Sequence, residues 1–174
     1  MHFIYCFLFL LAGIKWGDWK NWRDYYPTIL FLIGGDLLKN ALLHNHRMWA
    51  FQEVFFGQKI LIGHFAIDLM VMTIIYPVTI LIYLGHYPRV WWKQIIWVAI
   101  WVFLFSAKEF INLNYLNLIN HYHGWNMGWS ILFNIAMFVI LRIHFKNPPY
   151  AWTVSIIWIV FLFNWFNIPI DVFK

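Results

Sequence analysis

Acidic and basic side chains lie inside stretches of this chain that are otherwise apolar enough to cross a lipid bilayer. Of its seven Asp and Glu residues, Asp36, Asp68 and Glu109 lie in such stretches, with Lys39 and Lys108 beside them. An ionisable group in a membrane is energetically expensive and usually faces a protein interior or a water-filled cavity. These residue types therefore predict proton or cation exchange in a polar cavity.

A histidine and an acid occur at helical spacing within this set. His64 and Asp68 are four residues apart, so they share one face of a helix. A carboxylate that holds the ring N–H orients the imidazole, as in proton relays and metal sites. We take His64, Asp68 and Glu109 as candidate catalytic residues, with His64–Asp68 as a general-base pair. A histidine that is merely satisfied by interior packing fits the spacing equally well.

The remaining polar residues of the apolar stretches are candidate ligand-binding residues. They are Asp36, Lys39, Asn40, Lys108, Asn112 and Asn134. Asp36 and Lys39 are three residues apart and can form an ion pair. Lys108 and Glu109 point about 100° apart on a helix, so pairs between helices, Asp36–Lys108 or Lys39–Glu109, are also expected. The alternative is structural, with the asparagines only bonding helix to helix.

The composition places the chain among integral membrane proteins. Hydrophobic residues make up 63% of it and charged residues 11%, outside the soluble range. The net charge of +5 is spread over single cations between apolar runs, which indicates anionic membrane lipids as partners and no nucleic acid. The single cysteine, Cys6, permits no intrachain disulfide.

No cofactor or metal site is predicted. The His-x-His pairs His44/His46 and His121/His123 supply suitable metal ligands, but no HExxH, HxxxH or ExxH motif accompanies them. Nucleophile motifs such as GxSxG and phosphate-binding glycine loops are also absent from the sequence.

Apolar runs of about 20 residues predict transmembrane helices. The predicted fold is all-α, a polytopic bundle that forms a single membrane domain over residues 1–174. The six candidate spans lie near 2–16, 27–43, 60–84, 95–116, 127–145 and 151–170. The last two are joined by a short turn that contains Pro148 and Pro149, which suits a helical hairpin.

Lysine and arginine are distributed unequally between the two sides of these spans. One side holds Lys15, Lys20, Arg23, Arg89, Lys93, Arg142 and Lys146, and the other holds Arg47, Lys59 and Lys174. The positive-inside rule therefore predicts that both termini are extracytoplasmic. With that orientation the candidate site residues fall in the outer half of the bilayer, and the inner half is expected to be sealed by apolar side chains.

Several short motifs resemble a family of small multi-pass membrane proteins from endospore-forming Gram-positive bacteria. They are Lys15–Trp19, Asn21–Arg23, Tyr25–Thr28, Gly35–Leu38, Tyr76–Pro77, Leu81–Leu84, Gly124–Asn126, Trp129–Asn134, Leu141–Arg142 and His144. The resemblance covers nearly the whole chain. It implies a bacterial plasma membrane and a sporulation or germination setting, but no particular reaction.

Three classes of function fit these observations. The first is proton- or cation-linked transport or binding of a small molecule in an outward-facing cavity, and transport by so few helices would call for a homo-oligomer. The second is an intramembrane enzyme in which His64–Asp68 acts on a lipid-linked substrate at the outer leaflet. The third is a non-catalytic assembly protein with a membrane-protein partner.

The orientation can be tested by cysteine accessibility in intact cells. A single cysteine placed beside Lys174, in a Cys6→Ser background, should react with a membrane-impermeant thiol reagent added outside. A cysteine beside Lys93 should react only after the cells are permeabilised. The reverse pattern would invert the topology.

Overall fold

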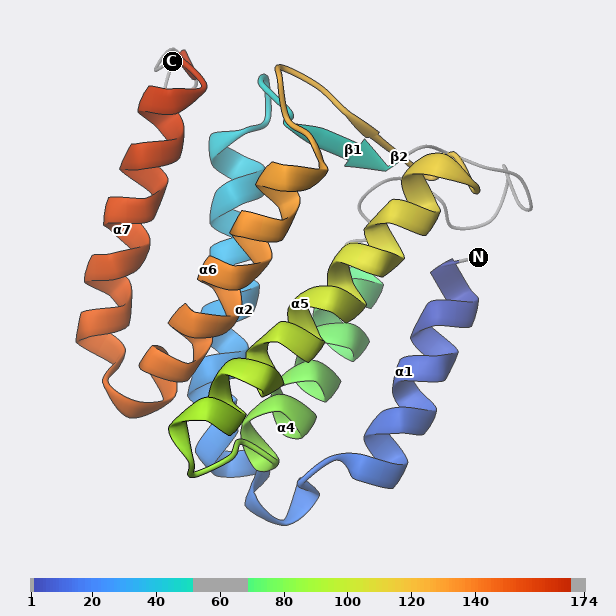
Figure 1. Ribbon diagram of the computed structural model, residues 1–174, viewed down its shortest axis with the longest axis vertical. Helices are drawn as coiled ribbons and strands as arrows, with labels where there is room; N and C mark the ends of the chain where they lie inside the picture. The colour runs from blue at the N-terminus through green and yellow to red at the C-terminus, as the bar shows by residue number, and fades with distance from the viewer. Residues whose placement is uncertain (1, 52–68, 170–174) are drawn as a thin grey trace.

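Helices make up most of the part of the chain that the structure, a computed structural model, describes: residues 2–51 and 69–169 (Figure 1). The α-helices are α1 (His2–Trp16), α2 (Trp22–Leu42), α4 (Tyr76–Gly85), α5 (Trp91–Asn114), α6 (Met127–Lys146) and α7 (Pro148–Trp165). A 3₁₀ turn, η1 (Trp19–Asn21), precedes α2, and a π-helix, η2 (Val71–Ile75), precedes α4. The all-α class is confirmed, and each α-helix overlaps the range of one predicted span. The first part of the span 60–84 lies outside the described residues.

Two of the described helices are both long and apolar enough to cross a membrane, namely α5 and α6. The segments Ile4–Trp16 and Val71–Gly85 are apolar but shorter. Length and composition thus give two candidate membrane-spanning helices, where the sequence pattern predicts six.

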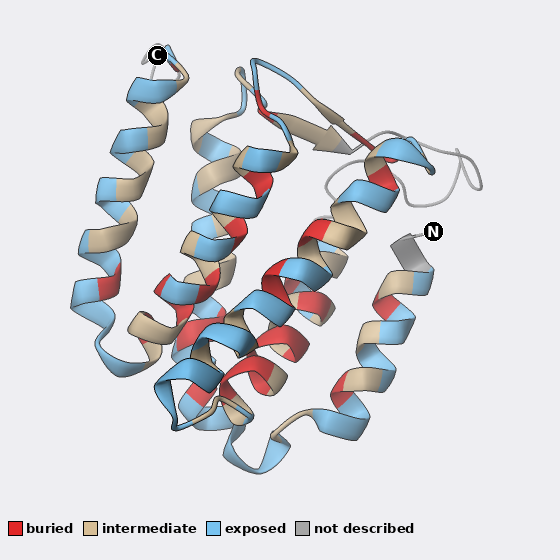
Figure 2. Ribbon diagram, in the orientation of Figure 1, coloured by how far each residue is buried: buried red, intermediate tan, exposed pale blue. Residues whose placement is uncertain are grey.

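The helix α4 lies at the centre of the bundle, where buried residues concentrate on it and on the facing sides of α5 and α6 (Figure 2). Tyr83 is fully buried there, and its hydroxyl donates to the Phe138 carbonyl of α6 at 2.9 Å. The indole N–H of Trp97 in α5 donates to the Tyr83 carbonyl at 3.0 Å. Hydrogen bonds and aromatic packing therefore join α4 to both long helices.

Apolar side chains cover the outside of the bundle as well as its core. Phe7 of α1, Phe103 of α5 and Ile157 of α7 are 60%, 70% and 63% exposed. Ala151 is the only residue of α7 that is buried. These helices have no polar face to present to water, so their outer surface suits a hydrocarbon environment.

The hairpin of α6 and α7 forms as predicted. The helix α6 ends at Lys146 and α7 begins at Pro148, where proline is favoured because it has no N–H to leave unpaired. The Asn147 side chain caps α7 by accepting from the Tyr150 N–H at 3.2 Å.

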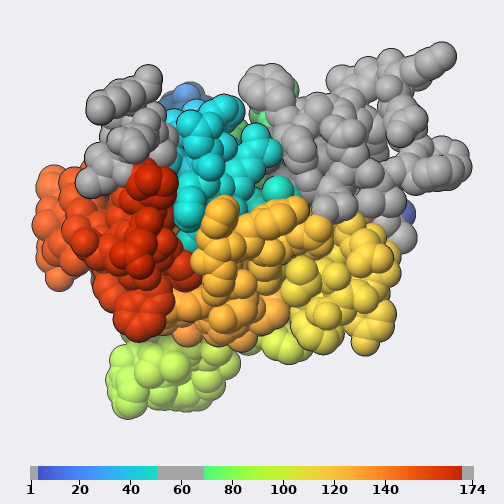
Figure 3. All heavy atoms as spheres, turned by 90° about the horizontal axis from the view of Figure 1, so that it is seen from above, coloured from blue at the N-terminus to red at the C-terminus, as the bar shows by residue number. Residues whose placement is uncertain are grey.

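A two-stranded antiparallel sheet closes one end of the bundle, and the sequence pattern did not predict it. Strand β1 (Trp49–Phe51) pairs with β2 (Ile119–His121) so that Trp49 lies opposite His121. In Figure 3, which looks onto this end, the segments that carry the strands lie beside the end of α7. Met48, Trp125 and Ile168 form a buried apolar cluster between them.

The contact of α1 with α4 depends on a glycine, and a second glycine provides a control. A Cβ added at Gly13 would lie 2.6 Å from Val78 Cγ2, whereas nothing lies within 4 Å of one added at Gly34. Gly13→Ala should therefore destabilise the protein by about 1–3 kcal/mol through overpacking. Gly34→Ala should be neutral or stabilising by up to about 1 kcal/mol, because alanine favours the helix.

Thermal unfolding in a neutral detergent measures both glycine variants. Val78→Ala should relieve much of the cost of Gly13→Ala by removing the methyl groups in the way. Equal melting temperatures for Gly13→Ala and Gly34→Ala would contradict the described packing of α1 on α4.

Candidate functional site

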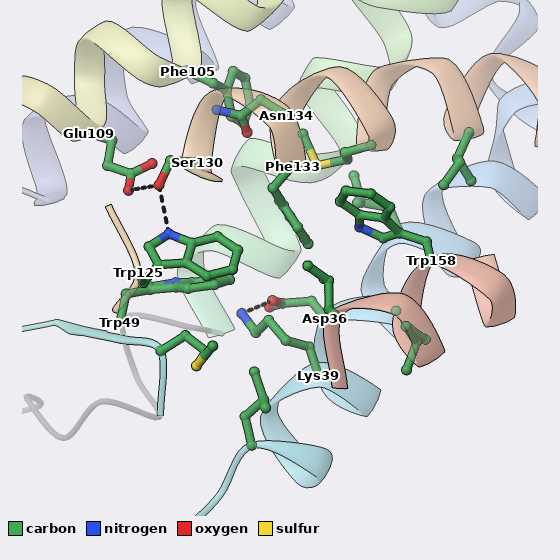
Figure 4. A pocket seen from close by; sticks show the side chains of 18 of the residues that line it. Asp36, Lys39, Trp49, Phe105, Glu109, Trp125, Ser130, Phe133, Asn134 and Trp158 are labelled. Atoms are coloured by element: carbon green, nitrogen blue, oxygen red, sulfur yellow. Dashed lines mark hydrogen bonds and ion pairs between the residues drawn. The ribbon is translucent and has the colours of Figure 1, made fainter. Parts of the chain in front are cut away.

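A cavity of about 310 Å³ lies beneath the β1–β2 sheet (Figure 4). Its walls come from α2, α5, α6 and α7, with Trp49 of β1 at one side. Most of the lining is aromatic or aliphatic, including Trp125, Phe133 and Trp158. An apolar cavity with a few convergent polar groups is the usual form of a small-molecule site.

The first polar group in the cavity is an ion pair on α2. Lys39 Nζ lies 2.5 Å from Asp36 Oδ1, at the spacing that predicted the pair. The side chains are 25% and 10% exposed, respectively. Lys39 Nζ also lies 4.9 Å from the centroid of the Trp49 ring, within the range of a cation–π interaction. The ammonium is thereby fixed between α2 and β1.

The second polar group is centred on the Glu109 carboxylate of α5. Its Oε1 accepts from Ser130 Oγ at 2.5 Å and lies 2.8 Å from His121 Nε2. Ser130 Oγ in turn accepts from the indole N–H of Trp125 at 2.8 Å. Figure 4 shows the chain from Trp125 through Ser130 to Glu109. The carboxylate thus links α5, α6 and β2.

The third polar group consists of Lys108 and Asn112, which are about one helical turn apart on α5. Lys108 and Asn112 both line the cavity, and Lys108 Nζ lies 5.6 Å from the centroid of the Tyr5 ring. The Tyr5 hydroxyl donates to Asn112 Oδ1 at 3.1 Å. Asn112 is 0% exposed, and its Nδ2 has no hydrogen-bond partner within the described ranges.

Most of the candidate ligand-binding residues are brought together by the fold. The residues Asp36, Lys39, Lys108, Asn112 and Asn134 line this cavity, together with the candidate catalytic residue Glu109. Asn134 Nδ2 donates to Ser106 Oγ at 3.1 Å, which is a bond between helices. Asn40 instead lines a separate groove beside α2 with His44 and Arg47. His64 and Asp68 lie outside the described residues.

The two expected ion pairs between helices do not form. Asp36 forms an ion pair with Lys39 of its own helix, and Glu109 Oε1 contacts His121 Nε2 at 2.8 Å. The spacing argument considered only residues inside the spans. It therefore could not include His121, which reaches Glu109 from β2 in a connection.

Sequence reasoning missed several residues of the site. Ser130 contacts Glu109 across the bundle, although no histidine or acid lies at a helical spacing from it. The indole N–H of Trp125 is buried and donates to Ser130 Oγ. A signal was present in the sequence, because Ser130 and Asn134 are four residues apart and share a face of α6.

The expected apolar seal of the opposite half is incomplete. Thr28 Oγ1 of α2 lies 3.0 Å from His144 Nδ1 of α6, and both residues are buried. The His144 ring also stacks on Phe31, with ring centroids 4.2 Å apart. A polar contact satisfied inside the bundle therefore replaces a purely hydrophobic layer.

The geometry around Glu109 suits proton exchange better than nucleophilic catalysis. In a serine nucleophile triad, the histidine contacts the serine and the acid orients the histidine. Here the carboxylate lies between Ser130 and His121 and bonds to both. Glu109 lines the cavity, and its contact with His121 gives two groups that can each hold a proton. Among residues 2–51 and 69–169, no group of three or more His, Cys, Asp or Glu side chains is placed to hold a metal ion.

The two His-x-His motifs meet at the rim of the bundle. The rings of His46 and His123 stack with centroids 3.7 Å apart. His123 (φ 54°) and Gly124 (φ 82°) both adopt left-handed backbone conformations, which reverse the chain between β2 and α6. His46 Nε2 is buried without a hydrogen-bond partner in the described part of the chain.

Comparison with protein-family models, with curated proteins and with solved structures gave no match to this chain.

The stacked histidines predict a pH dependence of stability. Burial, and then the nearby His123, lower the pKa of His46 from its ordinary value of 6.5. In the unfolded chain, His46 takes up a proton as the pH falls through about 6.5, whereas in the folded protein it takes up a proton only at a lower pH. Stability should therefore be complete above about pH 6.5 and fall as the pH decreases toward the folded-state pKa.

Thermal unfolding between about pH 8 and pH 5 measures this loss, since the histidine charge changes in that range. His46→Phe keeps a flat ring against His123 and removes the titrating group, so its melting temperature should change less with pH. A wild-type curve no steeper than that of His46→Phe would contradict the prediction.

Proposed function

We propose that this protein is a multi-pass protein of the bacterial plasma membrane that binds a small molecule in a proton-linked manner, in a cavity near the outer face. The observation that carries the proposal is the convergence of Asp36, Lys39, Lys108 and Glu109 on one aromatic-walled cavity. Charged groups gathered in the interior of an apolar bundle usually mark the path or site of a ligand.

The distribution of charge and apolar surface supports the membrane part of the proposal. The cations assigned to the cytoplasmic side flank the ends of helices opposite to the β1–β2 sheet, as with Lys15 at the end of α1 and Lys146 at the end of α6. The described chain termini lie toward the sheet end (Figure 1). An N-out orientation places the cavity in the outer half of the bilayer.

The contacts of Glu109 support the proton-linked part. The Glu109–His121 pair is neutral as a whole when the histidine is charged and carries a net negative charge when it is not. A ligand beside the pair would therefore bind with an affinity that depends on pH. Transport would follow if the cavity also opens to the other side, and an oligomer would supply the additional helices that such a movement requires.

A lipid-directed enzyme is the second candidate. The observation that favours it is that His121 Nε2 lies 2.8 Å from Oε1 of the cavity-lining Glu109, within the hydrogen-bond reach that proton transfer needs. The Ser130–Glu109 bond favours binding over nucleophilic attack, because Ser130 donates its proton to a carboxylate and not to a histidine.

Two adjacent glycines of α2 allow a matched test of the cavity. Gly35 lines the cavity and Gly34 does not, and nothing lies within 4 Å of a Cβ added at either. Gly35→Leu should fill the cavity and abolish binding, whereas Gly34→Leu should leave binding intact. Native mass spectrometry of protein extracted in a neutral detergent measures which small molecules remain bound.

The expected result is a bound mass in the wild type and in Gly34→Leu that is lost in Gly35→Leu. Its occupancy should change between about pH 8 and pH 5, and Glu109→Gln should flatten that change. Equal occupancy in both glycine variants would place the bound molecule outside the cavity and overturn the proposal.

A further inference from the structure

We infer that the ligand of this cavity is an amphipathic anion, whose carboxylate or phosphate head binds to Lys108 and Asn112 while its apolar body lies against the aromatic wall. The inference rests on the proposed function, because it concerns the chemistry of the molecule that the same cavity holds.

The charged groups that line the cavity are not all in contact with a partner of opposite charge. Asp36 is neutralised by Lys39 at 2.5 Å, and Glu109 is bonded to His121 at 2.8 Å. Lys108 is left as the lining cation that has no carboxylate within ion-pair distance among the described residues. An ammonium removed from water without a counter-charge is strongly destabilising, so an anion in the cavity would be bound favourably.

A second donor lies on the same helical face as Lys108. Asn112 is four residues further along α5 and therefore points to the same side of the helix. The Tyr5 hydroxyl occupies Asn112 Oδ1 at 3.1 Å, which directs the amide so that Nδ2 is the free group. That nitrogen is buried and has no acceptor among the described residues.

The two groups together match an anionic oxygen ligand. Lys108 supplies a charged donor, and Asn112 supplies a neutral donor through Nδ2. A cationic ligand would meet Lys108 with like charge, and a neutral apolar ligand would leave both donors unpaired.

The remainder of the cavity determines the body of the ligand. Its other walls include Phe133 of α6 with Trp158 and Leu162 of α7. These side chains offer apolar contact and no charge. A molecule that fits both regions has one acidic end and a hydrocarbon or ring system attached to it.

Quenching of tryptophan fluorescence by brominated amphiphiles tests the inference, because Trp49, Trp125 and Trp158 line the cavity. The protein, purified in a neutral maltoside detergent, is titrated with dibromostearate, with its methyl ester and with a dibromostearoyl phosphatidate. Dibromostearate should reach half-saturation at a concentration about tenfold or more below that of the ester. The phosphatidate arm shows whether carboxylate or lipid phosphate is preferred.

Variants of α5 assign the preference to the proposed residues. In Lys108→Met, the half-saturation concentration of dibromostearate should equal that of its methyl ester. Lys108→Arg should still bind the acid more tightly than the ester. Asn112→Leu should lower the affinity for the acid several-fold and leave the affinity for the ester unchanged. The matched control is Lys93→Met, on the same helix but stacked over Trp92 at its other end, which should behave as the wild type.

Each outcome distinguishes the two proposals. Saturable quenching with equal affinities for acid and ester overturns the anionic ligand and leaves the binding cavity standing. If none of the three probes shows saturable quenching that is lost in Gly35→Leu, the cavity is not a binding site and the proposed function is overturned. If Lys108→Met fails to fold, Lys108→Arg and Asn112→Leu still test the inference. Loss of the preference for the acid in Lys108→Arg would contradict it. An undiminished preference for the acid in Asn112→Leu would also contradict it.

Discussion

The buried contacts of Tyr83 are the constraint on which the rest of the bundle depends. Tyr83 is a residue of the short central helix α4, and its hydroxyl and carbonyl bond to α6 and α5. Its ring also packs edge-on against Phe138 and Trp101. Apolar packing alone does little to fix the relative orientation of helices that are apolar on all sides. Directional bonds at a single buried residue therefore fix the relative position of the long helices, and with it the spacing of the polar groups above them.

That spacing explains why the polar side chains form a site and are not dispersed. In an apolar environment each polar atom has to find a partner inside the protein. Asp36 and Lys39 satisfy each other locally, whereas Glu109 requires donors from α6 and β2, which only the assembled bundle provides. The site is a product of tertiary structure, although most of its members lie within single helices.

Local rules predicted the helices and much of the site, and they failed where partners come from the connections. The period and length of the apolar runs placed each described helix, and i,i+3 spacing predicted the Asp36–Lys39 pair. Three-residue strands carry too little pattern to be recognised, so the pairing of β1 with β2 was missed. His121 belongs to that sheet, and for this reason the partner of Glu109 could not be foreseen. Whether His64 and Asp68 act as a unit stays a prediction.

The attachment of α7 has a mechanical consequence. This helix packs mainly along α6, from which the tight turn at Asn147 separates it, and it contributes Trp158 and Leu162 to the cavity wall. Because α7 packs mainly along one neighbouring helix, a small tilt of α7 about that contact would change the width of the cavity more than its depth. In a bilayer the tilt of a helix responds to membrane thickness. In the proposed membrane setting, the lipid composition would therefore influence the width of the cavity independently of any molecule bound inside.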